Sequence, residues 1–263
     1  MPGKGDSRAA SPAWRLDGAR ALITGGSSGI GLAVAREFAA LGASLVLVAR
    51  DEGKLEIARE HICADFPGCG VDIVSADLSL DHDRCQVADS IDGGLQILVN
   101  NAGANIRKKM SEFSLAEYRQ VQQANIESCF EMCRLLYPRL AEADSACVVN
   151  NASVAGLVHL RTGVPYGMSK AAMLQMTRNL AVEWAQDGIR VNAVAPWYIR
   201  TPLADQVLSD ENYKKEVLDR TPMGRVGEVE ECARAIAFLA MPASAYITGV
   251  CLPVDGGFTA LGF

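Results

Sequence analysis

The sequence has few of the features that mark metal-binding, membrane or nucleic-acid-binding proteins. Only three histidines occur among 263 residues, and no H-x-x-x-H or C-x-x-C pair is present, so we expect no metal site. No apolar run approaches the ~20 residues that a membrane-spanning helix needs, and we expect no membrane partner. The net charge of -6 lacks the basic excess of a nucleic-acid-binding surface, so no such partner is expected either.

Secretion is not indicated by the cysteines or by the N-terminal segment. The eight cysteines include several in apolar runs, such as Cys147 and Cys251, which is typical of buried thiols in a reducing compartment. We therefore expect a cytoplasmic protein, with organelle targeting left open. The polar, Pro/Gly-rich start lacks the apolar core of a signal peptide. We predict a disordered tail over residues 1–15 and a single domain over 16–263.

A glycine-rich turn in the first half predicts a nucleotide site. The run TGGSSGIG lies between an apolar stretch (19–24) and a stretch of helical apolar spacing (32–41). Glycines let the backbone approach a pyrophosphate, and a helix N-terminus offers free N–H groups. Four glycines and two serines are more than a tight turn alone requires. The predicted cofactor residues of this run are Thr24, Gly25, Ser27, Ser28, Gly29, Ile30 and Gly31.

The next two predicted strands end in residues suited to the adenosine part of a dinucleotide. Arg50 follows Ala49, where NAD-binding chains usually carry an acid, and a guanidinium suits the 2′-phosphate of NADP(H). Alternatively, Arg50 pairs with Asp51 or with Glu52. Asp77, followed by Leu78, could accept a hydrogen bond from an adenine amino group, or it could cap the helix near 81–91.

Asparagines follow the predicted buried strand 95–99. The run NNAG places Asn100 and Asn101 at the strand end, where open α/β sheets bind ligands. We expect at least one of these amides to hold the backbone of the neighbouring loop. Asn101, Ala102 and Gly103 are also predicted to line the cofactor site.

The second half contains a candidate acid–base pair. Tyr166 and Lys170 lie at i and i+4, on one face of a predicted helix. An ammonium beside a phenol favours the phenolate and lowers its pKa. Such a spacing alone is weak, because it also occurs at ordinary helix starts. Ser153 stands just past the central strand 146–150, and Asn125 is a polar residue within a core-facing helical pattern.

Alternating strands and helices predict an α/β fold: a Rossmann-type doubly wound parallel sheet of about seven strands with helices on both faces. Pro253 inside the last strand indicates an edge position. The polar region 202–226 is predicted to form a helical lid over the cleft.

Taken together, these motifs resemble the short-chain dehydrogenase/reductase family over about residues 16–263. The runs RTGVPYGMSK and APWYIRTPL, with the ending ITGVCLPVDGGFTALGF, are most similar to tropinone reductases and their plant-type relatives. The resemblance implies that Tyr166 is the catalytic acid/base, that Ser153 binds the carbonyl oxygen, and that Lys170 lowers the tyrosine pKa and holds the nicotinamide ribose. It also implies that Asn125 binds a water for proton supply.

The resemblance further implies cofactor contacts and an assembly. Asn101 would lie beside the adenosine-side ribose, while Pro196, Ile199 and Thr201 would lie at the nicotinamide carboxamide. A homotetramer or homodimer is expected, with the helices around 115–140 and 166–186 at the interface.

One departure from the family pattern affects the substrate. Trp197 follows Pro196 where a glycine is usual, so its indole narrows the cleft, covers the cofactor or simply packs on the surface. Val154, Val158 and Leu160 predict an apolar cleft wall, which favours hydrophobic or alicyclic ketones. The candidate substrate residues are His159, Trp197, Tyr198, Leu203 and Val207.

These features predict an NADP(H)-dependent carbonyl reductase/alcohol dehydrogenase for a small or medium ketone. One alternative is a 3-oxoacyl-thioester reductase, which would need a basic landing patch such as Arg107, Lys108 and Lys109. A second is a non-catalytic nucleotide-sensing protein, and the presence of both Tyr166 and Lys170 argues against it.

Overall fold

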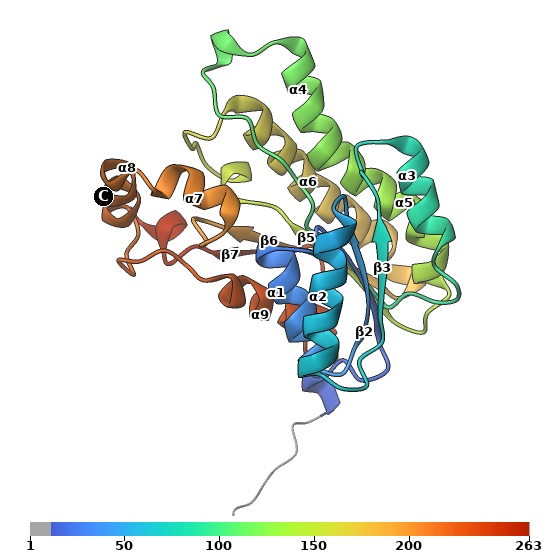
Figure 1. The fold of residues 1–263 in the computed structure, drawn as a ribbon. Coiled ribbons are helices and arrows are strands. Elements are labelled where there is room, and N and C mark those ends of the chain that lie inside the picture. The colour runs from blue at the N-terminus through green and yellow to red at the C-terminus, as the bar shows by residue number, and fades with distance from the viewer. Residues whose placement is uncertain (1–11, 263) are drawn as a thin grey trace, which may run out of the picture.

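Seven parallel strands form one twisted sheet in the order β3-β2-β1-β4-β5-β6-β7 (Figure 1). The computed structural model describes residues 12–262. The strands are β1 (Arg20–Thr24), β2 (Ser44–Ala49), β3 (Val71–Ser75), β4 (Ile97–Asn100), β5 (Ala146–Asn151), β6 (Ile189–Pro196) and β7 (Cys251–Val254). The order reverses between β1 and β4, which creates the crevice where doubly wound sheets bind ligands. The predicted fold class is confirmed.

Helices cover both faces of the sheet (Figure 1). They are α1 (Gly29–Ala40), α2 (Glu52–Asp65), α3 (Asp81–Asp89), α4 (Leu115–Gln122), α5 (Ser128–Ala141), α6 (Val164–Glu183), α7 (Pro202–Leu208), α8 (Glu211–Asp219) and α9 (Val229–Ala240). One face carries α1, α2 and α9, while the other carries α3, α5 and α6, with α4 packed on α6.

Strand side chains alternate between two hydrophobic cores. Ile23, Leu47 and Val99 belong to the core under α1 and α9. Their neighbours Leu22 and Val46 belong to the core under α5. Because successive strand residues face opposite sides, a strand buried on both faces must be apolar at every position. This is why the central strands are continuous apolar runs in the sequence.

The last strand lies at the edge of the sheet, as Pro253 predicts. β7 pairs only with β6, and Pro253 stands opposite Ala195 in that register. A proline lacks the N–H that a central strand would have to donate.

The lid prediction and the tail prediction have different outcomes. Residues 202–226 contain α7 and α8, so the region is helical, and Figure 1 shows both helices beside the β6–β7 end of the sheet. Residues 1–11 lie outside the described part. Residues 12–15, however, do not belong to a disordered tail: Pro12–Trp14 forms a 3-10 turn, and Trp14 stacks on Phe238 with ring centroids 5.9 Å apart. None of the helices within residues 12–262 is long and apolar enough to cross a membrane.

Candidate functional site

Two adjoining cavities open at the carboxyl ends of the strands. The larger, of about 420 Å³, lies over the ends of β1, β4, β5 and β6. The smaller, of about 410 Å³, lies over the ends of β2 and β3. Gly25, Ser28 and the segment 102–104 line both, so the two cavities form one elongated crevice at the switch point.

Most residues predicted from the sequence line this crevice. The predicted residues that line the larger cavity are Gly25, Ser28, Gly29, Ile30, Asn101, Ala102, Gly103, Ser153, Tyr166, Lys170, Pro196, Trp197, Tyr198, Ile199, Thr201 and Leu203. Those that line the smaller are Gly25, Ser27, Ser28, Arg50, Asp77, Leu78, Ala102 and Gly103. Thr24, Gly31, Asn125, His159 and Val207 line neither.

The glycine-rich turn is shaped for close approach of a ligand to the backbone. Gly25 has a φ of +67°, and Ser28 precedes the first turn of α1, whose residues Gly29 and Ile30 line the larger cavity. A Cβ on Gly31 would lie 2.2 Å from the carbonyl oxygen of Gly25, so only glycine fits there. This glycine cradle at the N-terminus of α1 fits a dinucleotide pyrophosphate.

Thr24 acts behind the cradle instead of lining it. Its Oγ accepts hydrogen bonds from the backbone N–H groups of Asn101 and Ala102, each at 2.9 Å. This bond pair ties the end of β1 to the loop after β4. Thr24 therefore fixes the width of the crevice.

The asparagines at the end of β4 both bind neighbouring groups, and one of them, Asn101, holds a neighbouring backbone group as expected. Asn101 donates from Nδ2 to the carbonyl oxygen of Thr24 at 2.9 Å and accepts from Asn151 Nδ2 at 2.8 Å. Asn100 is buried and donates to Asn150 Oδ1 at 3.0 Å. Thus the ends of β1, β4 and β5 are joined by side-chain amides.

Arg50 lies at the rim of the smaller cavity and forms no ion pair among residues 12–262. The alternative pairing with Asp51 is not observed, because Asp51 caps α2 by accepting from the Lys54 backbone N–H and pairs with the Lys54 ammonium at 3.5 Å. Lys54 also lines this cavity. The sequence analysis did not single out Lys54 as a second cation here.

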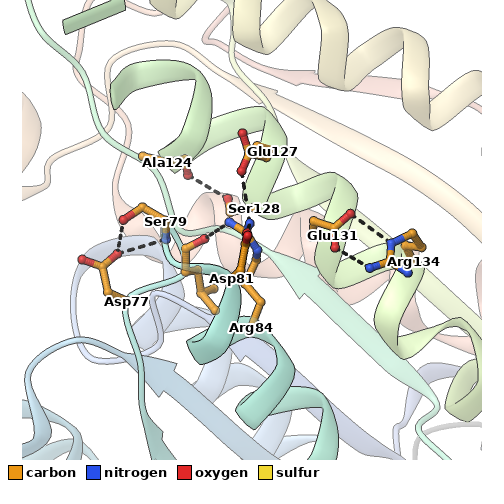
Figure 2. A network of polar contacts seen from close by, with 10 residues as sticks. Asp77, Ser79, Asp81, Arg84, Ala124, Glu127, Ser128, Glu131 and Arg134 are labelled. Carbon is orange, nitrogen blue, oxygen red and sulfur yellow. Dashed lines mark hydrogen bonds and ion pairs between the residues drawn. The ribbon is translucent and has the colours of Figure 1, made fainter. Parts of the chain in front are cut away.

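Asp77 lies in the turn before α3 (Figure 2) but does not cap this helix, whose N-cap is Leu80 and has no side-chain cap bond. Asp77 does line the smaller cavity. Its Oδ1 accepts from the Ser79 N–H at 3.0 Å and from the Ser79 hydroxyl at 2.8 Å. Burial raises the pKa of Asp77, but the hydrogen bonds from Ser79 and the nearby Arg50 guanidinium outweigh it, so the net pKa is lowered. The carboxylate therefore stays ionised as a hydrogen-bond acceptor.

The sequence analysis did not identify Arg84, a buried arginine that Figure 2 shows beside Asp81 and Glu127. Arg84 is only 2% exposed, donates to the Leu78 carbonyl oxygen at 2.8 Å, and pairs with Asp81 and with Glu127. It therefore links α3 to the turn that precedes α5 and holds Leu78 at the cavity. Nothing in the local sequence distinguishes it from a surface arginine.

The candidate acid–base residues meet in the larger cavity. Pro165 lies in the first turn of α6, a position that proline favours, and this start places Tyr166 and Lys170 on one face. The Ser153 hydroxyl lies close enough to the Tyr166 phenol to lower its pKa. Lys170 is buried, donates to the carbonyl oxygen of Asn151 at 2.7 Å, and lies 5.7 Å from the Tyr166 ring centroid.

The pKa of Tyr166 departs from its ordinary value in the direction opposite to the sequence-based expectation. Burial raises this pKa, and the effect outweighs the lowering by the Ser153 hydroxyl and by the Arg107 guanidinium. Burial lowers the pKa of Lys170 itself to about 8. Desolvation, which depends on the three-dimensional surroundings, dominates both groups.

Asn125 is fully buried at a break in the helical pattern. Gln123–Glu127 forms a π-helical turn between α4 and α5, a feature that often occurs at functional sites. The Asn125 Oδ1 accepts from the Ala104 N–H at 2.7 Å, and its Nδ2 donates to the Ala104 carbonyl oxygen and to Ser169 Oγ. A Cβ on Gly103 would lie 2.9 Å from Asn125 Oδ1 and 3.9 Å from Lys170 Nζ. The side chain thus positions the cavity floor beside Lys170.

Trp197 is held at the substrate side by three contacts. Its indole stacks on Phe258 with centroids 3.8 Å apart, meets Tyr198 edge-on at 4.6 Å, and donates to Thr221 Oγ at 3.1 Å. It lines the larger cavity, so it narrows the cleft and is not a loose surface indole. No local pattern in the sequence indicates its pairing with Phe258.

Other substrate-side predictions are placed differently. Leu160 and Leu203 line the larger cavity, whereas Val154 is completely buried. His159 is exposed and lines two neighbouring hollows. Val207 packs into a small cluster with Ala204 and Val217 between α7 and α8, so it stabilises the packing of these helices and does not line the cavity.

The cavity also contains Asn151 and Thr162, which the sequence analysis did not assign to a site, and Arg107, which it named only as part of a carrier-protein landing patch. Asn151 could have been found, since it ends β5 much as Asn101 follows β4. Within residues 12–262, no group of three or more His, Cys, Asp or Glu side chains could hold a metal ion.

Comparisons with known proteins agree with this geometry. The family model described as Enoyl-(Acyl carrier protein) reductase matches residues 25–259. A chloroplastic tropinone reductase homolog of Arabidopsis thaliana is 45% identical over 95% of this chain and 78% of its own length. Tropinone reductase homologs thus resemble nearly the whole chain.

Solved structures are also similar to this chain over nearly its whole length. A putative NAD(P)-dependent gluconate 5-dehydrogenase from Beutenbergia cavernae with bound NADP has a TM-score of 0.91 at 33% identity, covering 95% of this chain and 100% of that one. A gluconate 5-dehydrogenase from Burkholderia cenocepacia in complex with NADP and tartrate has a TM-score of 0.89 at 32% identity, with coverage of 95% and 99%.

The sheet, the cradle and the tyrosine–lysine pair define a Rossmann-fold oxidoreductase with an NAD(P)-type nucleotide cofactor. The chain belongs to the short-chain dehydrogenase/reductase family.

The burial of Lys170 is predicted to lower the free energy of unfolding by an amount that depends on pH. Its pKa falls from 10.5 to about 8 on folding, so the unfolded chain binds the proton more tightly between these values. The contribution of Lys170 to the free energy of unfolding therefore rises as the pH increases from about 8 to 10.5. We expect Lys170→Met to raise the free energy of unfolding by ~1–2 kcal/mol at about pH 7, because the relief of desolvation exceeds the cost of leaving the Asn151 carbonyl unpaired, with a gain that shrinks above about pH 8.

Chemical denaturation at pH 7, 9 and 10.5 measures this effect. Lys215→Met, at an exposed position on α8, serves as the control and should change stability little at any of the three pH values. A Lys170→Met variant that is less stable than the parent at pH 7 would contradict the prediction.

Proposed function

We propose that this protein is an NADP(H)-dependent carbonyl reductase/alcohol dehydrogenase that acts on a small or medium, hydrophobic or alicyclic ketone. The observation that supports it most is the convergence of Ser153, Tyr166 and Lys170 on one 420 Å³ cavity beside the glycine cradle. A nicotinamide bound in this crevice would supply the hydride for reduction and accept it for oxidation.

In reduction, Tyr166 would protonate the carbonyl oxygen and Ser153 would donate a hydrogen bond to the same atom. The raised pKa of Tyr166 keeps the phenol protonated at neutral pH, as a proton donor must be. Ser153 is itself fixed, because its Oγ accepts from the Ala155 N–H at 3.1 Å. Such a preorganised donor stabilises the developing alkoxide.

Lys170 and Asn125 would hold the site together and resupply the proton. Lys170 carries a charge at neutral pH because its pKa is about 8, and it would bind the nicotinamide ribose. The Asn125 side chain is occupied by Ala104 and Ser169. A water in a proton path past this residue would therefore bind its backbone and not its amide.

The preference for NADP(H) is supported by Arg50. Its guanidinium lies at the cavity rim without an ion-pair partner among residues 12–262, and Lys54 lines the same cavity. A 2′-phosphate would give Arg50 a partner, and the Lys54 ammonium, which pairs with Asp51, would add to the positive field there. Two of the solved relatives are described with bound NADP.

The substrate class is supported by the cavity wall and by the relatives. Leu160, Trp197 and Leu203 give it an apolar side, and the matching plant proteins are named as tropinone reductase homologs. A 3-oxoacyl-thioester reductase gains little support, since Lys108 of the required landing patch pairs with Glu117 and Arg107 lines the cavity.

We also propose a homotetramer or homodimer in a reducing compartment such as the cytoplasm. Phe130 on α5 and Val182 on α6 are 51% and 80% exposed, apolar side chains on the helices expected at the interface. All eight cysteines are free thiols, and two of them, Cys63 and Cys85, are exposed.

Tyr166→Phe removes the transferable proton while preserving the ring. We expect kcat/KM to fall about 100- to 10,000-fold, with the dissociation constant for NADPH nearly unchanged, as measured by NADPH oxidation and by fluorescence titration. Tyr246→Phe, at a fully exposed tyrosine, is the control. Substantial turnover by the Tyr166→Phe variant would refute the assignment.

Arg50→Asp tests the cofactor preference. It replaces a phosphate-binding cation with an acid, so we expect NADPH to bind about 10- to 100-fold more weakly and NADH to bind no worse. The matched control is Lys215→Asp, which makes the same charge change on α8. An unchanged ratio of the two affinities would show that Arg50 does not bind the phosphate.

Sedimentation equilibrium tests the assembly. We expect a dimer or tetramer at micromolar concentration, and we expect Phe130→Glu with Val182→Glu to shift it toward the monomer because charges are costly in an interface core. A monomeric parent protein would contradict the proposal.

A further inference from the structure

The charged side chains that line the larger cavity are all positive. Among the residues that line it, none is an aspartate or a glutamate, and the only charged ones are Arg107 and Lys170. This contrasts with the whole chain, whose net charge is -6. Lys170 has a place in the proposed chemistry, whereas nothing described so far uses Arg107.

Arg107 has no protein partner for its charge. Within residues 12–262 no carboxylate lies within ion-pairing distance of it, and its Nε is buried without a hydrogen-bond partner. Two neighbouring cations do have partners, since Lys108 pairs with Glu117 and Arg161 pairs with Glu216. Buried donors in proteins are nearly always satisfied, so an unpaired one in a cleft indicates a ligand.

The position of Arg107 assigns it to the substrate side. Its guanidinium is close enough to lower the pKa values of both Tyr166 and Tyr198. It lines the larger cavity with Leu160 and Thr162 but is absent from the smaller one, where Arg50 lies. A cofactor phosphate at Arg50 would therefore not neutralise Arg107.

We propose that Arg107 is a specificity-determining residue that binds the carboxylate of an oxo acid, whose carbonyl then faces Tyr166. This inference rests on the proposed ketone reduction and narrows its substrate class. The planar guanidinium binds a carboxylate through two parallel hydrogen bonds. The apolar wall of Leu160 and Trp197 accommodates the carbon skeleton between the two ends.

A carboxylate and its uncharged methyl ester, on the same ring ketone, test the proposal. With 4-oxocyclohexanecarboxylate and its methyl ester as substrates, NADPH oxidation gives kcat/KM for each. We expect the parent protein to favour the acid over the ester, and Arg107→Met to lower that ratio roughly 10- to 100-fold. Arg107→Lys should retain part of the preference, and Lys108→Met, the charged neighbour, should keep the parental ratio.

A binding measurement separates this inference from the proposed function. Calorimetry with cyclohexanecarboxylate and the NADPH-loaded protein requires no turnover; we expect binding to the parent protein that weakens at least about tenfold in Arg107→Met. Thermal unfolding of each variant shows that it is folded. Reduction of neither ketone, with carboxylate binding retained, would refute the ketone function alone.

Three results would overturn the proposal for Arg107. They are a parental preference for the ester, an acid-to-ester ratio that Arg107→Met leaves unchanged, and carboxylate binding that is absent or independent of Arg107. The first two are compatible with a reductase of neutral ketones.

Discussion

The site depends on a seam of polar contacts that joins the carboxyl ends of three strands. Thr24 ties β1 to the loop after β4, Asn101 ties that loop to β5 through Asn151, and the Asn151 carbonyl holds the Lys170 ammonium. Each contact satisfies a group that the crevice would otherwise leave unpaired, so the seam is stable although it is polar and largely buried. The distance between the cofactor cradle and the acid–base pair is set by this seam.

Several features of the fold and of the site could be predicted from short stretches of sequence, because they depend on residues that are neighbours in the chain. The apolar strands, the edge position of Pro253, the start of α6 and the bond of one strand-end asparagine, Asn101, to a neighbouring backbone group were all expected from short sequence patterns. The cradle is of this kind too, because only glycine fits at position 31.

The parts that were missed depend on contacts between distant segments. The direction of the Tyr166 pKa is decided by burial among several loops, and Val207 faces the lid core because α8 packs against it. Arg84 is buried because α3 meets the turn before α5. A local sequence pattern contains no information about neighbours from distant segments. It can therefore predict that a residue lies in a helix or a loop, but it cannot predict what surrounds the side chain.

The stack of Trp197 on Phe258, with the bond to Thr221, joins three segments that are far apart in the chain. One wall of the cleft is therefore specified by residues well outside the catalytic set. Substitutions at Phe258 or Thr221 can tilt the indole and reshape the space for the substrate while Ser153, Tyr166 and Lys170 stay in place. The shape of the substrate space can therefore change in this protein while its catalytic chemistry is retained.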